Sequence, residues 1–212
     1  MKVELIAITR YLRGDGTPEE LLEHASRICY HSERRGEPGK FIQARVREGH
    51  ESIIEHASAS FKISGISRAC SHQLVRHRLA SYSQESQRYV EMTNPAWALP
   101  PDILENEEAL AIWEDFAGDV TEAYEALREL GIRKEDARFV LPNAAATQII
   151  VTMNFRELLH FFRIRISRAA QWEIRDVGVR MLELVYEQAP SVFADIRSNL
   201  MERYPAFFEG LE

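Results

Sequence analysis

The sequence predicts an α+β fold, in which a small, mostly antiparallel sheet is surrounded by helices in a single domain over residues 1–212. Segments of alternating apolar and polar residues are interspersed with segments that have apolar residues at helical spacing, and no regular βαβ repeat is visible. The length fits one large domain or two small ones, and no Gly/Ser linker or internal repeat divides the chain. With 45% hydrophobic residues, the chain can form a substantial core.

The first two elements are a strand and a helix. The chain opens with a strand-like alternation that places Val3, Leu5 and Ala7 on one face. Residues 17–20, Thr-Pro-Glu-Glu, then supply an N-cap, a proline at the first helical position and the acid of a capping box. We therefore expect a helix over residues 17–33.

The next elements lead into a basic segment. A short helix is expected at 41–48, stopped by Gly49, and the alternation in HASASFKIS at 56–64 indicates a half-buried strand. Apolar residues then recur at helical spacing through GISRACSHQLVRH, residues 65–77. A helix is therefore expected to end near the basic residues 76–78.

The second half of the chain reads as strands and longer helices. YVEM at 89–92 is predicted to be a return strand, and the short β-branched run TQIIVTM at 147–153 another strand. Between them, the acidic segment 102–130 has the pattern of one long amphipathic helix closed by Gly131. These assignments complete the expected sheet.

Two helices are expected at the C-terminal end. Asn154 followed by Glu157 forms a second capping box, which opens a helix through LLHFF at 158–162. The last long helix is expected over 170–188, ended by Pro190.

Charge is unevenly distributed along the chain. The net charge of −7 argues against a non-specific nucleic-acid binder. Arginines nevertheless gather in two segments, 62–88 and 154–180, whereas 102–136 is strongly acidic. Any single arginine is more often a surface residue that pairs with the acidic helix than a ligand-binding residue, because most surface charges have no function beyond solvation or weak pairing. Two arginine-rich segments in an acidic protein still favour an anionic small-molecule ligand.

The composition also predicts the setting. No apolar run approaches the roughly 20 residues of a membrane span, and MKVELIAITR lacks the long apolar region of a signal peptide. The two cysteines, Cys29 and Cys70, form no CxxC pair. We therefore expect a cytoplasmic protein without membrane association or a disulfide framework.

Few residues offer catalytic chemistry of their own. The spacing of His50 and His56, and of His72 and His77, puts neither pair on one helical face, so no metal site is expected. No GxSxG, GxGxxG or P-loop motif is present, and both cysteines fall on helical apolar faces, where a buried thiol is the default. Arginines with Ser, Gln, Asn and His remain, a set that binds anions but needs a cofactor for difficult chemistry.

One motif in the basic segment is specific. Arg76-His77-Arg78, then seven residues, then Ser86 resembles the RHRx7S signature of the flavin-dependent thymidylate synthases. Further matching stretches follow in the same order as in that family, namely GHES at 49–52, SQRY at 86–89, ARFVLP at 137–142, MNFRELLHF at 153–161 and AQWEIR at 170–175. The resemblance covers nearly the whole chain.

This resemblance implies a fold, a reaction and an assembly. The chain would be a methyltransferase that makes dTMP from dUMP, with 5,10-methylenetetrahydrofolate as carbon donor and NADPH-reduced FAD as hydride source. The family has an α+β fold and uses no cysteine nucleophile. It forms homotetramers whose active sites combine residues from more than one chain. No nucleic acid or membrane partner is expected.

The matching positions imply the site residues. Those expected to bind FAD are His50, Ser52, Arg76, His77, Arg78, Gln84, Asn154, Phe155, Arg156 and His160. Those expected to bind dUMP are Gln73, Arg76, Gln84, Glu85, Ser86, Gln87, Arg88, Arg138 and Arg165. By resemblance, Arg165 is catalytic, because it stabilises the N3-deprotonated pyrimidine. Ser86 and Arg88 would hold the phosphate, with the Glu85 carboxylate pointing away.

Other interpretations stay open at this stage. Arg76 and Arg78 could form ion pairs at a subunit interface, and Arg165 could cap a helix C-terminus. The whole chain could be a flavoprotein that acts on another nucleotide, or a nucleic-acid-binding module that places the basic segment on phosphates. The low pI, about 5.6, and the scarcity of aromatic residues near Arg76 speak against the binding module.

Overall fold

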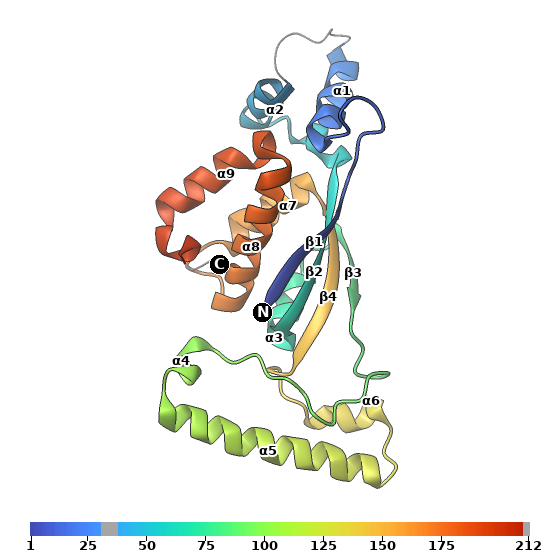
Figure 1. Cartoon of the computed structure of the whole chain (residues 1–212), viewed down its shortest axis with the longest axis vertical. Coiled ribbons are helices and arrows are strands. Elements are labelled where there is room, and N and C mark those ends of the chain that lie inside the picture. The colour runs from blue at the N-terminus through green and yellow to red at the C-terminus, as the bar shows by residue number, and fades with distance from the viewer. Residues whose placement is uncertain (31–37, 210–212) are drawn as a thin grey trace. The chain divides into compact units, whose positions relative to one another are not determined.

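The computed structural model describes residues 1–30 and 38–209, and it confirms the α+β class (Figure 1). The sheet is antiparallel and has four strands in the order β1-β2-β4-β3. The strands are β1 (Lys2–Ile8), β2 (Ser58–Ser67), β3 (Ala80–Gln84) and β4 (Ala146–Asn154). The strand predicted at the start of the chain and those at 56–64 and 147–153 are thereby confirmed.

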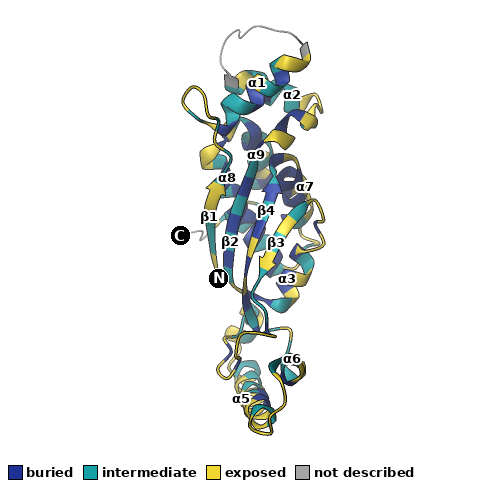
Figure 2. Ribbon diagram, turned by 90° about the vertical axis from the view of Figure 1, so that its right-hand side faces the viewer, coloured by how far each residue is buried: buried dark blue, intermediate teal, exposed yellow. Residues whose placement is uncertain are grey.

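The two central strands carry much of the core. Buried and less buried residues alternate along β2 and β4, as expected for strands with one covered face (Figure 2). The edge strands β1 and β3 have no fully buried residue. The buried side chains include Ala59, Phe61 and Ile63 on β2 and Ile149, Val151 and Met153 on β4.

The chain divides into two compact units. The first unit comprises Met1–Lys2, Ile63–Leu74 and Ser83–Ile149, and the second comprises Val3–Lys62, Val75–Tyr82 and Ile150–Glu212. In the second unit lie α1 (Pro18–Tyr30), α2 (Pro38–Arg47), η1 (Glu51–His56), α7 (Phe155–Arg165), α8 (Trp172–Gln188), α9 (Pro190–Arg203) and η3 (Pro205–Phe208). In the first unit lie α3 (Arg68–Leu74), α4 (Pro101–Leu104), α5 (Glu107–Glu129), α6 (Lys134–Ala137) and η2 (Arg138–Val140).

Aromatic rings join the helices of the second unit. Helices α7, α8 and α9 contact one another. The ring of Phe193 on α9 meets Phe155 and Phe162 of α7 edge to face, with centroids 5.1 and 6.0 Å apart. Gly178 on α8 allows a close approach, because a Cβ there would lie 3.1 Å from Ile166 Cγ1 and 3.6 Å from the Phe161 ring. The core of this unit therefore reaches the helix that carries several predicted site residues.

A smaller core holds the first unit. Met92, Tyr124 and Ala137 are buried together, and Leu127, Val140 and Leu141 pack against them. The backbone N–H of Met92 donates to the Tyr124 hydroxyl at 3.3 Å. This contact ties the segment after β3 to α5 instead of to the sheet. The return strand predicted at 89–92 is therefore wrong, and the strand lies earlier, in β3.

Several helix boundaries differ from those predicted. The helix predicted at 102–130 is two helices, because Asn106 interrupts it and its side chain accepts from the Ala109 N–H at 3.0 Å as the N-cap of α5. The predicted end at Gly131 is confirmed, with a φ of 80°. Ile66 belongs to β2, not to the following helix. Residues 31–33 of the first predicted helix lie outside the described residues.

The C-terminal prediction missed one helix. Pro190 does follow the end of α8, but it also starts α9, because proline fits the first helical position, where an N–H needs no partner. Cys29 was expected to be buried and is exposed, since it lies in the last turn of α1, beyond the buried Leu22 and Ser26. Cys70 is buried as expected. Among the described residues, no helix has the length and apolar character needed to span a membrane.

We predict that two helical glycines differ in their response to alanine. Gly118→Ala in α5 should raise the free energy of unfolding by about 0.5–1 kcal/mol, because alanine is the better helix former and nothing lies within 4 Å of the new Cβ. Gly178→Ala should gain less or lose stability, because its Cβ meets Ile166. Urea denaturation of both variants measures the difference, and equal gains would contradict the close packing of α8.

Candidate functional site

The basic segment and helix α7 line one cavity in the second unit. Its volume is about 320 Å³. One wall is the segment 76–79, which follows α3, and the other is formed by Glu157, His160, Ile164 and Arg165 of α7. The structure therefore brings the RHR motif and the predicted catalytic arginine to the same cavity.

Local sequence explains why α7 presents these residues. The Asn154 side chain accepts the Glu157 N–H at 2.9 Å, so this residue is the N-cap, as predicted. Residues three, four or seven positions apart share a helix face, which groups Glu157, His160 and Ile164. Only one half of the predicted capping box is formed, namely the bond from the Glu157 N–H to the Asn154 side chain. The Glu157 carboxylate contacts His77 instead of turning back to the N-cap.

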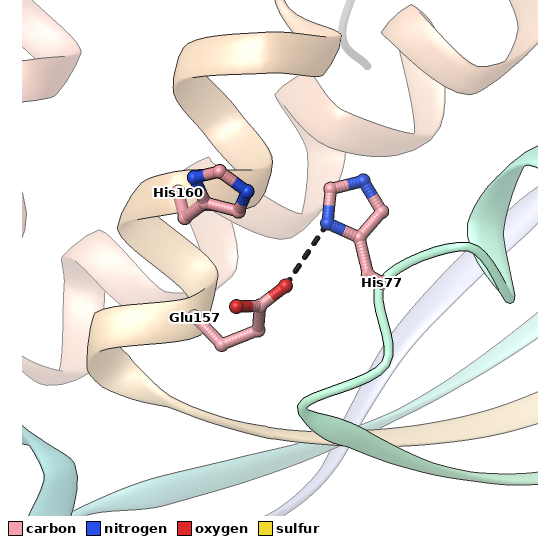
Figure 3. A group of neighbouring side chains, drawn as sticks. All are labelled: His77, Glu157 and His160. Carbon is pink, nitrogen blue, oxygen red and sulfur yellow. Dashed lines mark hydrogen bonds and ion pairs between the residues drawn. The ribbon is translucent and has the colours of Figure 1, made fainter.

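His77 is the centre of a buried polar cluster (Figure 3). Its Nδ1 lies 3.0 Å from Glu157 Oε1, and the Nε–H of Arg165 donates to its Nε2, also at 3.0 Å. His77 is 5% exposed and Glu157 6%. The His77 ring packs edge to face against Phe161, with centroids 4.9 Å apart. The imidazole is therefore held by a carboxylate, a guanidinium and an aromatic ring.

Burial dominates the titration of this cluster. It lowers the pKa of His77, and the charges of Arg165 and His160 lower it further, whereas Glu157 opposes the shift through its hydrogen bond and charge. The hydroxyl of Tyr82 donates to the His77 carbonyl at 2.8 Å. Burial, with the Glu157 charge, raises the pKa of Tyr82 to about 12. Both side chains are therefore neutral at pH 7.

The same cluster resembles a metal site in geometry. Ligand atoms of His77, Glu157 and His160 lie within 4.8 Å of one another. The spacing rules for helical metal pairs did not find it, because His77 and His160 come from different elements. The permanent charge of Arg165, in contact with His77, opposes a divalent cation here. We therefore do not assign a metal to this cluster.

Other residues expected to bind FAD lie on α7 and the adjoining η1. Asn154 uses its side chain as a cap, and Arg156 pairs with Glu55 and, at 3.7 Å, with Glu51 of η1. The Phe155 ring is fully buried against Phe193, so only its backbone can reach a ligand.

Two further FAD-binding candidates precede this helix in the chain. His50, at the N-cap of η1, has a side chain that is 49% exposed. Ser52, in the first turn of η1, is exposed. Elements η1 and α7 contact each other within the second unit, so these residues share a region with the start of α7.

Most residues expected to bind dUMP lie in the first unit. Gln84 donates to the Ser71 hydroxyl at 2.9 Å and to Thr147 at 3.4 Å. The Glu85 carboxylate accepts from Gln148 Nε2 at 2.8 Å, so it is held at the sheet. The Ser86 hydroxyl accepts the Arg88 N–H at 3.3 Å, which orders the following turn.

The remaining dUMP candidates are placed by short-range contacts. Gln87 is buried, and Gln73 on α3 donates to the Ala69 carbonyl at 3.5 Å. Arg138 starts η2, and its Nε donates to the Glu135 carbonyl at 3.1 Å. Two of the dUMP candidates, Arg76 and Arg165, lie in the second unit. Among the FAD candidates, Gln84 lies in the first unit and the others lie in the second. Both predicted ligand sites are therefore divided between the units.

Positive charge collects around Arg88. Its guanidinium is 2.8 Å from the Glu135 carboxylate, which Arg133 also contacts at 2.7 Å. Together with Tyr89, Arg128 and Lys134 they line a cavity of about 270 Å³. This cavity presents more cations than carboxylates, as an anion site requires.

Glu91 balances the other two cations of this cavity. It pairs with Arg128 at 2.8 Å and with Lys134 at 3.0 Å. The hydrogen bond from Arg128 is the main cause that lowers the pKa of Glu91, followed by that from Lys134. Glu91 is therefore charged at neutral pH.

Sequence reasoning missed Glu157 and Glu135, which line these two cavities, and Tyr82, which contacts the His77 carbonyl. Glu157 was assigned to a capping box, and its position three residues after an N-cap gave no sign of a second partner. Tyr82 occupies one of the seven unspecified positions of the RHRx7S motif, and Glu135 lies in no motif. The contact of Glu135 with Arg88 joins positions 47 residues apart. These contacts depend on the fold, so spacing along the chain could not reveal them.

Comparison with known proteins matches the sequence of this chain to one family. The family model described as thymidylate synthase complementing protein matches residues 9–191. A flavin-dependent thymidylate synthase of Geobacter sulfurreducens is 48% identical over 189 residues, with 84% of this chain and 82% of the relative covered. The enzyme of that name from Nitratidesulfovibrio vulgaris is 45% identical, with 91% and 85% covered. That from Clostridium tetani is 37% identical over the same shares.

The match to the family model spans both compact units and includes every candidate site residue from His50 to Arg165. The expected resemblance is thereby confirmed. The chain belongs to the family of flavin-dependent thymidylate synthases, and its activity is that of a thymidylate synthase with a flavin cofactor.

Proposed function

We propose that this chain reductively methylates dUMP to dTMP, with 5,10-methylenetetrahydrofolate as carbon donor and NADPH-reduced FAD as hydride source. The observation that carries the proposal is the single cavity lined by the RHR motif and Arg165. We further propose that both units act as one catalytic domain. The family model supports this, because its match runs through both units.

The second unit has the residues to hold FAD. Arg76 and Arg78 supply permanent positive charge, which suits a pyrophosphate, and both are exposed at the cavity. Leu79 and Ile164 add apolar surface at the same cavity, which suits a flat ring. The donor set therefore fits the cofactor. When bound, FAD supplies the hydride chemistry that this chain's side chains lack.

The first unit has the residues to hold the dUMP phosphate. Arg88 offers a guanidinium that is half exposed, and the turn at Ser86 is already ordered by its own hydrogen bond. Glu85 is kept at Gln148, as expected from its sequence position beside the phosphate site. Backbone N–H groups and Arg88 can then receive the phosphate without the nearby carboxylate.

Arg165 has the chemistry for the reacting base. Deprotonation at N3 puts negative charge on the pyrimidine, and a fixed guanidinium beside it stabilises that charge. His77 receives the Nε–H of Arg165, and this contact fixes the direction of the guanidinium. No side-chain nucleophile is needed for this role.

We propose a homotetramer in which several chains complete each site. Membership of the flavin-dependent thymidylate synthase family supports this assembly. We also propose a cytoplasmic location, which the two free cysteines support. Family membership displaces the nucleic-acid-binding module as an alternative.

Replacing the proposed catalytic arginine should separate cofactor binding from turnover. Arg165→Ala should bind FAD and remain yellow, yet release tritium from C5-labelled dUMP about 10²–10³-fold more slowly, because a preorganised donor is lost. Arg163→Ala is the matched control, since Arg163 lies on the same helix and pairs with Glu51 on its exposed side. A normal rate in Arg165→Ala would refute the catalytic role.

Glu135 should compete with the dUMP phosphate for Arg88. Glu135→Gln should tighten dUMP binding about two- to fivefold, the scale of an exposed ion pair, and leave deoxyuridine binding unchanged, because that ligand has no phosphate. Calorimetric titration at low ionic strength measures both affinities. Glu105→Gln, an exposed carboxylate at the end of α4, controls for net charge. Weaker dUMP binding in Glu135→Gln would contradict the competition.

A further inference from the structure

The contacts of His77 determine where its ring proton lies. A guanidinium nitrogen can donate a hydrogen bond but cannot accept one. Because the Arg165 Nε–H points at His77 Nε2, at 3.0 Å, that ring nitrogen must present its lone pair. The proton of the neutral ring is then on Nδ1, where it donates to the Glu157 carboxylate at 3.0 Å. The two contacts are consistent with each other only in this tautomer.

We propose that Glu157 is a positioning residue for the catalytic guanidinium: it fixes the His77 tautomer and ring, and His77 in turn holds Arg165. This inference rests on the proposed role of Arg165. A carboxylate that orients an imidazole, which then acts on a third group, is a known way of fixing both orientation and tautomer.

The burial of the Glu157 carboxylate favours this positioning role over a role in helix capping. A carboxylate at the third position of a helix usually turns back to the N-cap, where it is near water. The Glu157 carboxylate is 6% exposed and directed at an imidazole that is 5% exposed. A buried charge is costly unless a hydrogen bond compensates for it. The position of this side chain is therefore explained by His77 rather than by the start of α7.

The arrangement also predicts the effect of acid. A second proton on His77 would turn Nε2 into a donor and bring two cations together, so Arg165 would be released. The charged or titratable groups that act on the ring are Glu157, His160 and Arg165 of α7. Tyr82 of β3 contacts the His77 backbone carbonyl, and Arg76 and Arg78 are its neighbours in the chain. Since burial lowers the pKa of His77, the neutral ring persists below the ordinary value of 6.5.

Nitrogen-15 NMR of the imidazole rings tests the tautomer without any turnover. In the cofactor-free chain labelled at its seven histidines, the signal that disappears in His77→Gln should show a protonated Nδ1 and an unprotonated Nε2 at pH 7.5. In Glu157→Gln the amide can accept from or donate to Nδ1, so a fraction with protonated Nε2 should appear. Glu23→Gln removes another buried carboxylate, which pairs with Arg27, and should leave the His77 signal unchanged.

Turnover tests the consequence for Arg165. Glu157→Gln should retain FAD but lower kcat about 10- to 100-fold, the usual scale for residues that orient another group. Because Glu157 raises the pKa of His77 against burial, its loss should lower that pKa further. The acid limb of the kcat profile should therefore move to lower pH. Glu157→Asp, which keeps the charge, should recover part of kcat, and Glu23→Gln should not move the limb.

The outcomes separate this inference from the proposed function. If the wild-type chain forms dTMP but Glu157→Gln has the same kcat and the same acid limb, the positioning role is wrong and the function stands. If His77 carries its proton on Nε2 in the wild type, the inference is also wrong. If the wild type forms no dTMP while the NMR result is as expected, the proposed function fails and the ring geometry stands.

Discussion

The site depends on holding a permanent positive charge in a partly buried place. A guanidinium cannot lose its proton, so the protein has to compensate its charge and fix its direction at the same time. Arg165 meets this requirement through a neutral imidazole, whose lone pair receives Nε–H and whose other nitrogen reaches a buried carboxylate. The neutral imidazole orients the Arg165 guanidinium without placing a second positive charge next to it. Catalysis by a fixed dipole or charge needs this kind of preorganisation.

Packing in the core holds His77 and α7 in place, and thereby stabilises the contact between His77 and Arg165. The Phe161 ring packs against His77 on one side, and Gly178 of α8 lets the backbone approach Phe161 and Ile166 on another. A Cβ at this position would press on Ile166, while it would only touch the Phe161 ring. The Asn154 cap sets the start of α7, and thus the rotation that aims Glu157 and His160 at the cavity. The packing of α7 in the core therefore also fixes the geometry of the site residues that it carries.

The sequence predicted what local pattern controls. Alternation located β2 and β4, the cap at Thr17 located α1, and Gly131 located the end of α5, because each signal acts within a few residues. Asn106 shows the limit, since an N-cap inside an acidic helical pattern was not recognised.

Contacts over long distances in the chain were not predictable in this way. The sequence predicts no strand at β3, because its residues are mostly small and polar and its pairing partner β4 comes more than 60 residues later in the chain. The RHR motif and Arg165 were identified by resemblance, whereas Glu157 and Glu135 were not, because ordinary capping and surface positions gave no local sign. The contacts of Glu157 with His77 and of Glu135 with Arg88 form only once the chain has folded.

The two carboxylates show how burial assigns different functions to the same chemical group. Glu135 contacts a half-exposed Arg88, where water screens the pair and its net stabilisation is small, so an incoming phosphate can replace it. Glu157 contacts a buried imidazole, where breaking the hydrogen bond would leave a charge without compensation. An anion can therefore displace Glu135 from Arg88 at little cost, whereas displacing Glu157 from His77 is costly. This difference agrees with the proposed roles, in which Arg88 receives the dUMP phosphate and His77 keeps the direction of Arg165 fixed.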